Sequence, residues 1–306
     1  MLRLNSFSEL NKIEGPVNLA IGFFDGVHLG HQAVINNIIS SDEGSSVVLT
    51  FDPHPLSVLS PSQSPPIITA LSHKQSLIEE LGVEYLLVIR FDENRVNQRA
   101  EGFVREIVDS CKLKSVSVGN EFRFGYERQG DVSLLTELGM DLGFKVNGID
   151  RICDEAGDVI SSTRVREALK NGNLKDAKSL LGREFSISGP VTKGNEIGQG
   201  MSFPTANIDI IGSSPIPHGV YAVLANVGGE SFQGVANLGV RPTFTESNDF
   251  KTKLEVHLFD FERMIYGEII EVSFVGYMRE EKKFNSVDDL KNQINADVIE
   301  AKRVFS

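Results

Sequence analysis

Residues 17–40 read Val-Asn-Leu-Ala-Ile-Gly-Phe-Phe-Asp-Gly-Val-His-Leu-Gly-His-Gln-Ala-Val-Ile-Asn-Asn-Ile-Ile-Ser, and this stretch decides the fold of the first half of the chain. Its first part, Val17–Gly22, predicts a strand, and Val27–Ser40 predicts a helix with one apolar side. Between them, Gly22 and Gly26 let the backbone turn and come close to a ligand. A strand that turns directly into a helix is typical of an α/β fold.

The same alternation of strand and helix signals continues to residue 149. Strands separated by helices favour a mostly parallel sheet covered on both faces. Ligands of such sheets bind at the carboxyl ends of the strands. We expect further strands at Val47–Phe51, Tyr85–Phe91, Ser115–Gly119 and Phe144–Ile149, and helices at His73–Leu81, Ala100–Cys111 and Val132–Leu142.

A proline-rich stretch interrupts this pattern. Five of the eleven prolines lie between Pro53 and Pro66. Proline lacks a backbone donor and restricts the residue before it, so this stretch predicts a loop. A loop of this length is often a lid or a binding loop.

The pattern changes after Leu181. Strand-like segments follow one another there, mostly separated by Gly, Pro, Asn or Ser, which predicts an antiparallel barrel or sandwich. We therefore place a domain boundary at Gly182, with residues 1–182 as one domain and residues 183–306 as the other. The expected strands are Phe185–Lys193, Val220–Val227, Phe232–Leu238, Leu254–Phe261 and Ile269–Tyr277.

An amphipathic helix is expected at the end of the chain. Ser286 can cap its first turn, and Asp289 stands where a capping box has its acidic member. This helix would pack on the barrel through its apolar residues Val287, Leu290, Ile294, Val298 and Phe305.

Composition and charge limit the classes of function. The chain has 306 residues, of which 41% are hydrophobic and 24% charged, as in ordinary folded proteins. The net charge is −12, with −7 on residues 1–182 and −5 on residues 183–306. Non-specific nucleic-acid binders need a basic face, so we expect no nucleic-acid partner. An acidic chain can still hold a local basic site for a phosphorylated small molecule.

The sequence also bears on location and redox chemistry. No apolar run is long enough to span a bilayer, so we expect no membrane partner. Residues 1–15 lack the unbroken apolar stretch of a signal peptide, which makes the cytoplasm the expected location. The two cysteines, Cys111 and Cys153, cannot form a disulfide framework or a zinc cluster.

His28 and His31 form the first chemical motif. They are three residues apart, so they share one face of the first helical turn, where free N–H groups and the positive end of the dipole collect. Two imidazoles there can donate hydrogen bonds to phosphate oxygens as charge builds during transfer. An isolated His-x-x-His is more often a capped helix start, but residues 22–31 form a longer and more specific string. His54 could supply a third zinc ligand, yet this spacing fits no zinc motif.

Residues 161–166, Ser-Ser-Thr-Arg-Val-Arg, open another expected helix. The hydroxyls of Ser162 and Thr163, with the N–H groups of the helix start, can hold phosphate oxygens, and Arg166 can add a bidentate charge. An ordinary helix cap with surface arginines would look the same. Paired with the histidine motif, the segment favours a polyphosphate site.

These motifs carry a family resemblance. His-x-Gly-His with Ser-Ser-Thr-x-x-Arg is similar to the nucleotidylyltransferase superfamily. Residues 22–31, with Thr-Phe-Asp-Pro-His-Pro at residues 50–55, resemble the FAD synthetase module of the bacterial bifunctional riboflavin kinase/FAD synthetases. Residues 119–125, Gly-Asn-Glu-Phe-Arg-Phe-Gly, also match that family. The family usually has Asp or Asn where this chain has Glu121.

The resemblance implies roles for residues of the first domain. There, AMP from ATP would join FMN and give FAD and pyrophosphate. His28 and His31 would stabilise the α-phosphate as it is attacked, and Ser162, Thr163 and Arg166 would hold the departing pyrophosphate. Further implied ATP contacts are Gly22, Phe24, Asp25 and Gly26, and implied flavin contacts are Asn120, Phe122 and Arg123.

Residues 189–207 form a second chemical motif, with four glycines in its first twelve residues. The spacing of a P-loop is absent, but a glycine loop can still wrap phosphates with backbone N–H groups. Glycine richness alone would fit a barrel hairpin. The run Phe-Pro-Thr-Ala-Asn at residues 203–207 resembles the flavokinase signature. The ATP contacts this implies are Gly189, Lys193, Gly194, Gly200, Thr205 and Asn207, and the last two offer neutral oxygens that suit Mg²⁺.

The segment Leu254–Phe261 alternates apolar and polar residues, and its pattern alone does not rank Glu255 above His257. In the family, the glutamate of Glu-x-His-x-x-Asp-Phe is the candidate base that takes the proton of riboflavin's 5′-hydroxyl, and Glu255 occupies that place. Asn237, which begins a further family match, is the implied flavin contact in this domain. The family often has Arg and Gly where this chain has Gln199 and Ser202.

The expected architecture is therefore an α/β nucleotidylyltransferase-like domain followed by a flavokinase-like antiparallel barrel with a terminal helix. The expected activity is the conversion of riboflavin to FMN and of FMN to FAD, each with ATP and magnesium, and the oligomeric state stays open. One alternative is an RNA-acting ligase such as an aminoacyl-tRNA synthetase, which would need a lysine-rich loop that is absent. Another is a flavin-binding regulator without catalysis, suggested by Gln199, Ser202 and Glu121.

Overall fold

The computed structural model describes residues 1–306 apart from residues 42, 194–203, 211–214 and 242–250. The chain forms two compact units. The first unit comprises Met1–Pro65 and Lys74–Ser161, and the second comprises Pro66–His73 and Ser162–Ser306. Within the described ranges, no helix is both long and apolar enough to cross a membrane.

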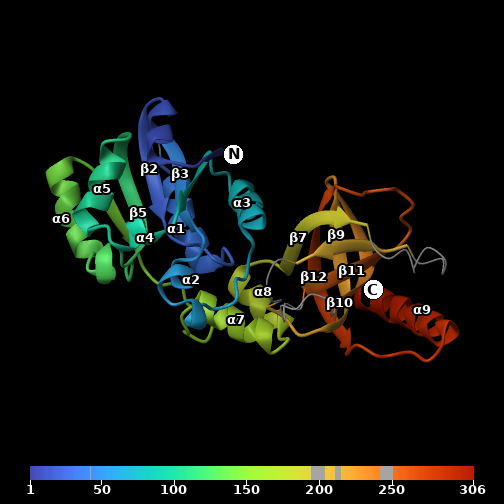
Figure 1. The fold of residues 1–306 in the computed structure, drawn as a ribbon. Coiled ribbons are helices and arrows are strands. Elements are labelled where there is room, and N and C mark those ends of the chain that lie inside the picture. Colours follow the sequence, from blue (N-terminus) through green and yellow to red (C-terminus); the bar gives the residue numbers. More distant parts are fainter. Residues whose placement is uncertain (42, 194–203, 211–214, 242–250) are drawn as a thin grey trace. The chain divides into compact units, whose positions relative to one another are not determined.

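A parallel sheet forms the centre of the first unit (Figure 1). Every neighbouring pair of its strands is parallel, which confirms the expected α/β architecture. The apolar strand residues pack into a core that also contains residues of the flanking helices. In the described part of the chain the strand order is β1 (Leu2–Leu4), β4 (Tyr85–Arg90), β3 (Ser45–Asp52), β2 (Pro16–Ile21), β5 (Lys112–Gly119) and β6 (Lys145–Ile149).

The direction of chain progression reverses at β2. From β2 the chain moves outward to β3 and β4 on one side, and it later returns to place β5 and β6 on the other side. β2 and β5 are direct parallel neighbours, with Ala20 opposite Ser117. Ligands of open α/β sheets bind at such a reversal, at the carboxyl ends of the strands. The segments that follow β2 and β5 therefore lie at the same edge of the sheet.

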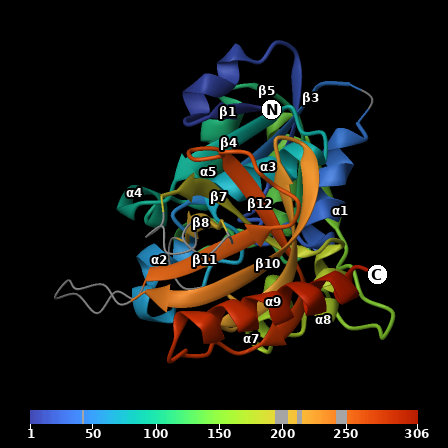
Figure 2. The same cartoon turned by 90° about the vertical axis from the view of Figure 1, so that its right-hand side faces the viewer.

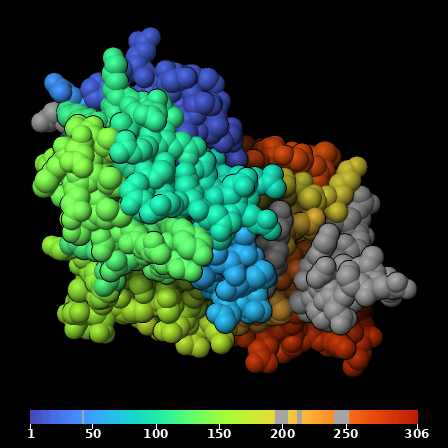
Figure 3. All heavy atoms as spheres, turned by 60° about the vertical axis from the view of Figure 1, so that its left-hand side comes forward, coloured from blue at the N-terminus to red at the C-terminus, as the bar shows by residue number. Residues whose placement is uncertain are grey.

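Helices cover this sheet. In α5, Phe103, Val104 and Ile107 recur at helical spacing and are buried in the core. In the space-filling view, α4 to α6, coloured teal to green, lie together on the visible face of the first unit (Figure 3). The helices are α1 (Leu29–Ile39), α4 (Glu93–Val96), α5 (Ala100–Val108) and α6 (Val132–Leu142), with the 3₁₀ turns Phe7–Lys12 and Tyr126–Arg128; α3 (Leu71–Glu80) begins in the second unit and continues into the first.

The proline-rich stretch is not the simple loop that the sequence predicts. It contains the short helix α2 (Pro55–Leu59) and a 3₁₀ turn, Pro61–Gln63. Each begins with a proline, and a proline at the first helical position loses no hydrogen bond and has the φ angle a helix requires. The Nδ1 atom of His54 caps α2 by accepting the N–H of Leu56 at 2.9 Å. Proline here starts helical turns.

A closed antiparallel barrel forms the second unit, as expected for the flavokinase-like domain. Gly228 and Gly229, both with positive φ, connect β9 to β10 in a two-residue turn. The helices α7 (Ser162–Lys170) and α8 (Leu174–Leu181) precede the barrel. In the described residues its closed order is β10 (Glu230–Arg241), β11 (Lys251–Leu258), β8 (Ala206–Asp209), β7 (Phe185–Thr192), β12 (Ile269–Arg279) and β9 (Gly219–Val227).

The C-terminal helix α9 (Val287–Val304) lies against this barrel beside β10 (Figure 2). Ser286 caps it, because its side chain accepts the N–H of Asp289 at 3.1 Å. Val298 and Phe305 pack on a buried barrel cluster, as predicted. The prediction is wrong for Val287, which is 58% exposed, because the helix packs on that cluster through its later turns.

A buried ion pair fixes α9 to β12. Arg279 donates from Nε and Nη2 to the two carboxylate oxygens of Asp297, at 2.8 and 2.6 Å, and Asp297 is 5% exposed. Gln293 also donates to that carboxylate. Removing one member of such a pair leaves an uncompensated charge in a poorly solvated place.

We expect Asp297→Asn to destabilise the second unit by about 3 kcal/mol, because Arg279 loses its counter-charge. Glu300→Gln, on the same helix, is the matched control, since Glu300 and Arg303 form an exposed pair that contributes less than about 1 kcal/mol. Urea unfolding followed by circular dichroism measures both. Equal stabilities of the two variants would contradict the assignment.

Candidate functional site

The glycine turn, residues 22–28, joins β2 to α1. Its backbone is unusual, because Phe24, Gly26 and Val27 all have positive φ angles of 54°, 84° and 44°. Such angles are costly for Phe and Val, and they persist only where the surroundings enforce them. At Gly22, a Cβ atom would come within 2.9 Å of the Phe24 ring, so the turn needs glycine there. The glycine turn thus has a strained conformation that the surrounding structure maintains.

The two histidines are stacked at the start of α1. His28 is the N-cap, so the helix begins at Leu29 and not at Val27, as the sequence predicts. The His28 Nδ1 atom accepts the N–H of His31 at 3.3 Å, and the two rings stack with centroids 3.6 Å apart. Because Nδ1 accepts, the neutral His28 ring carries its proton on Nε2, which is a donor suited to a phosphate oxygen.

The predicted flavin contacts follow β5. The N–H of Asn120 donates to the Ile149 carbonyl at 3.0 Å, and its side chain donates to Asp150 at 2.6 Å, which ties the segment to the end of β6. The Phe122 ring stacks on Phe124 with centroids 5.3 Å apart. Since β2 and β5 are neighbours, the first unit places at one sheet edge the predicted residues Gly22, Phe24, Asp25, Gly26, His28, His31, Asn120, Phe122 and Arg123.

Charged residues in this segment are already paired. Glu121, where the family usually has Asp or Asn, forms an ion pair with Arg151. The hydrogen bond from Arg151, assisted by the charges of Arg151 and Arg123, lowers the pKa of Glu121. Arg123 itself pairs with Asp131 at 2.8 Å, and Asp131 caps α6. A flavin phosphate bound by Arg123 would therefore share that guanidinium with Asp131.

The predicted pyrophosphate contacts belong to the second unit. Helix α7 begins at Ser162, so Ser162 and Thr163 lie in its first turn, where backbone N–H groups have no partner within the helix. The Nε atom of Arg166 donates to the carbonyl of Pro66 at 2.8 Å. These three residues thus belong to the second unit, and the histidine pair belongs to the first.

Strand register brings the predicted kinase residues together in the barrel. Glu255 on β11 lies directly opposite Asn207 on β8 and opposite Asn237 on β10. Directly paired residues of antiparallel strands present their side chains on the same face. Thr205 comes just before β8, and its carbonyl accepts the side-chain amide of the buried Asn207 at 3.4 Å. One face therefore carries Asn207, Glu255 and Asn237 in a row.

Two charged neighbours of this row were not predicted. The Nζ atom of Lys253 donates to Glu255 Oε1 at 2.7 Å, and the two residues are two apart on one strand, so they share a face. Glu281 accepts the side-chain amide of Asn237 at 3.1 Å. The Asn237 Oδ1 atom is buried and, in the described part of the chain, has no hydrogen-bond partner. An unsatisfied buried acceptor beside a carboxylate suits a ligand that carries hydroxyl groups.

A hollow of about 270 Å³ begins at Thr205. Its lining is largely apolar and includes a tyrosine, which suits a flat heterocycle. The lining residues are Val191, Pro204, Thr205, Ala206, Val256, Leu258, Phe261, Glu262, Arg263, Met264, Ile265 and Tyr266.

The glycine-rich segment before Thr205 is described in part. At Gly189, on β7, a Cβ atom would come within 2.8 Å of Ile208 Cγ2, so glycine lets β8 approach closely. Lys193 is exposed just after β7. Gly194 and Gly200 lie outside the described residues, as do Gln199 and Ser202.

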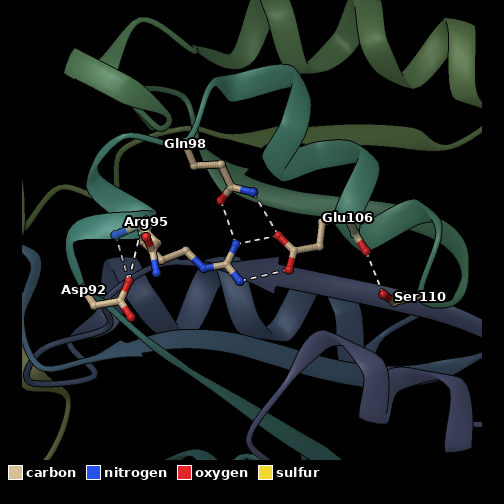
Figure 4. Close-up of polar contacts among 6 residues, drawn as sticks. Asp92, Arg95, Gln98, Glu106 and Ser110 are labelled. Atoms are coloured by element: carbon tan, nitrogen blue, oxygen red, sulfur yellow. Dashed lines mark hydrogen bonds and ion pairs between the residues drawn. The ribbon is translucent and has the colours of Figure 1, made fainter.

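The first unit also contains a polar cluster that was not predicted from the sequence (Figure 4). Arg95 donates to both carboxylate oxygens of Glu106 at 2.5 and 2.9 Å, and Gln98 donates to the same carboxylate. The Arg95 hydrogen bonds lower the pKa of Glu106. The Arg95 guanidinium also lies 4.9 Å from the ring centre of Phe7. These contacts tie α4 to α5 and to the Phe7–Lys12 turn, which is a structural role.

Comparison with known proteins assigns the chain to a family. A family model described as FAD synthetase matches residues 10–164, and one described as riboflavin kinase matches residues 181–305. The bifunctional riboflavin kinase/FMN adenylyltransferase of Escherichia coli strain K12 is 40% identical over 95% of this chain and 93% of that protein. The chain belongs to the bifunctional riboflavin kinase/FMN adenylyltransferase family. The bifunctional riboflavin kinase/FMN adenylyltransferase of Buchnera aphidicola subspecies Schizaphis graminum is 36% identical over 100% of this chain and 99% of that protein.

A solved structure has a similar fold. It is described as a macrolide-efflux protein from Streptococcus pneumoniae, and it matches with a TM-score of 0.79 and 27% identity over 98% of each chain. The family resemblance and the two-part fold class predicted from the sequence are thereby confirmed.

We expect Gly30→Ala to disturb the histidine pair, because a Cβ atom there would lie 3.1 Å from His28 Cε1. The imidazole proton resonances of His28 and His31 should shift in NMR spectra. The matched control is Gly102→Ala on α5, where a Cβ atom has room and alanine should stabilise the helix by about 1 kcal/mol. Unchanged imidazole resonances in Gly30→Ala would mean that the stacking does not depend on this glycine.

Proposed function

We propose that this chain makes FMN and FAD in two ATP-dependent steps, riboflavin phosphorylation in the barrel and FMN adenylylation in the α/β domain. The observation that carries the proposal is the register that places Glu255 between Asn207 and Asn237. Membership of the bifunctional family supports both activities and their order along the chain.

In the first step Glu255 takes the proton of riboflavin's 5′-hydroxyl as its oxygen attacks the γ-phosphorus of ATP, and ADP leaves. The Lys253 ammonium, 2.7 Å away, holds the carboxylate in place. The Asn237 Oδ1 atom, which is buried and accepts no hydrogen bond from a described residue, would accept one from a hydroxyl of the flavin side chain. One positioned carboxylate suffices, because phosphoryl transfer depends mostly on alignment and charge neutralisation.

Thr205 and Asn207 would hold Mg²⁺ together with the phosphates of ATP. The donor set fits, because Asn207 uses its amide nitrogen on Thr205 and keeps its side-chain oxygen for a ligand. Neutral oxygens beside a nucleotide are typical of magnesium, which keeps several waters and phosphate ligands. Among the described residues, no three His, Cys, Asp or Glu side chains gather as a metal site. Bound there, the ion would neutralise charge on the phosphates.

The hollow beside Thr205 would take the adenine of this ATP. The hollow includes Thr205, while its strand residues Ala206 and Val256 lie on the face opposite to Asn207 and Glu255, so the base and the phosphates would be joined around Thr205 at the start of β8. Gly189 and Lys193 would contact the nucleotide, together with Gly194 and Gly200.

In the second step the FMN phosphate attacks the α-phosphorus of a second ATP, and pyrophosphate leaves. The phosphate is already ionised, so this step needs no base. His28 and His31 would donate hydrogen bonds to the α-phosphate as its charge builds. Gly22, Phe24, Asp25 and Gly26 would contact the nucleotide, Ser162, Thr163 and Arg166 the pyrophosphate, and Asn120, Phe122 and Arg123 the flavin.

The remaining assignments rest on the sequence. Residues 1–182 would form the adenylyltransferase domain and residues 183–306 the kinase domain, and the family matches at residues 10–164 and 181–305 support this division. The acidic net charge supports small-molecule partners over nucleic acids. The cytoplasm, where ATP is made and consumed, is the proposed location.

Replacing one residue in each domain tests which domain carries out which reaction. We expect Glu255→Ala to lower FMN formation from riboflavin by at least 100-fold, while FAD formation from supplied FMN persists. We expect His28→Ala to do the reverse. Products are separated by chromatography after incubation with ATP and magnesium.

Two exposed residues provide matched controls, Glu268→Ala for the carboxylate and His218→Ala for the imidazole. Both controls should keep both reactions. If Glu255→Ala and His28→Ala each retained both activities, the proposed roles of these residues would be wrong.

A further inference from the structure

We propose that Lys74 is a positioning residue for FMN adenylylation, whose buried ammonium holds the glycine turn in the conformation that presents His28. The inference rests on the proposed function of the first unit. Lys74 lies on α3 in the part that belongs to that unit, outside every motif that the sequence singled out.

The contacts of Lys74 converge on one residue of the glycine turn. Its Nζ atom donates to the carbonyl of Phe23 at 2.7 Å and lies 3.8 Å from the centre of the Phe23 ring. The hydroxyl of Thr50, on β3, donates to the same carbonyl at 2.9 Å. Phe23 immediately precedes Phe24, whose φ of 54° is the first strained angle of the turn. Two donors and a cation–π contact thus fix the peptide at which the strain begins.

The ammonium is under-satisfied for a buried charge. Lys74 is 2% exposed, and in the described part of the chain its only hydrogen-bond acceptor is the Phe23 carbonyl. A charge removed from water is costly unless opposite charges compensate it, and those of Asp25 and Asp52 do so only in part, because burial still lowers the pKa of Lys74. Thr50 already supplies a neutral donor to that carbonyl, so a hydrogen bond alone does not account for a buried cation. We attribute the burial of this cation to its charge, which lies against a turn proposed to receive a polyphosphate.

The groups around Lys74 set when it is charged. Burial lowers the pKa of its ammonium from 10.5 to about 8, and the negative charges of Asp25, after β2, and Asp52, at the end of β3, oppose that shift. The His54 ring packs edge-on against the Phe23 ring, which Lys74 contacts, with centroids 4.1 Å apart. The lysine therefore loses its charge as the pH rises through about 8.

Stability and activity should then respond to pH in opposite directions. In the unfolded chain the lysine keeps its proton up to about its ordinary pKa of 10.5, so between about 8 and 10.5 the unfolded state binds more protons than the folded state. This lysine makes folding more favourable as the pH rises through that range. Adenylylation, which needs the charge, should fall over the same range. A purely structural lysine would not separate the two.

The test is the pH profile of FAD formation from supplied FMN, ATP and magnesium, between about pH 6.5 and 9.5. In the wild-type protein kcat should fall with an apparent pKa near 8. Lys74→Met, which replaces the charge by an apolar chain of similar length, should lower kcat at least tenfold at pH 7 and abolish that fall. It should unfold no more readily than the wild type at pH 7, because it removes a buried charge.

Thr50→Val is the matched variant, because it removes the other donor to the Phe23 carbonyl and keeps the ammonium. It should lower kcat but retain the fall near pH 8. Riboflavin phosphorylation by the same protein is an internal reference that Lys74→Met should leave unchanged. Lys114→Met, at a partly exposed lysine of the same unit, should leave both reactions unchanged.

The proposal is overturned if wild-type kcat shows no fall near pH 8, or if the fall persists in Lys74→Met. It is also overturned if Lys74→Met keeps wild-type kcat. Should Lys74→Met fail to fold, the wild-type and Thr50→Val profiles decide on the same criterion. Failure of the proposed function would look different, since the wild-type protein would then form no FAD from FMN.

Discussion

Parallel pairing on both sides of β2 is the constraint on which the first unit depends. Because β3 and β5 both pair with β2, the chain must progress outward in two directions, and the segments after β2 and β5 meet at one edge. At this edge the packed surroundings hold the glycine turn at backbone angles that Phe24 and Val27, both buried, would not adopt by themselves. The stacked histidines begin α1 at the end of that turn. Geometry at the sheet edge thus determines which chemistry the helix start can perform.

In the barrel, β11 likewise pairs with a neighbouring strand on each side. Its neighbours β8 and β10 bring Asn207 and Asn237 to either side of Glu255, although the three residues are far apart in the sequence. The Lys253 contact is local to the strand, whereas Glu281 reaches Asn237 from the segment after β12. The two units therefore share a principle, since each assembles polar groups by pairing a central strand with two partners.

The sequence predicted features that are repeated locally and missed features that depend on pairing. The strand–turn–helix of residues 17–40 has clear periodicity, and α9 has a clear cap at Ser286. Strands β1 and β8 have three and four residues, too few to show alternation, and exist through their neighbours. Lys74 and Lys253 carry no motif, because their roles arise from contacts with Phe23 and Glu255. Strand register and burial determine these short strands and these lysine contacts. Neither can be predicted from a single segment of the sequence.

The two-glycine turn between β9 and β10 limits how this barrel can change. Side chains alternate between the two faces of a strand, so adding one residue to β10 ahead of Asn237 would turn its amide to the opposite face and bring a neighbour in its place. Adding two would restore the face but shift the partner along β11. Insertions and deletions in descendants of this protein should therefore occur outside this hairpin. The number of residues from Gly229 to Asn237 should stay fixed.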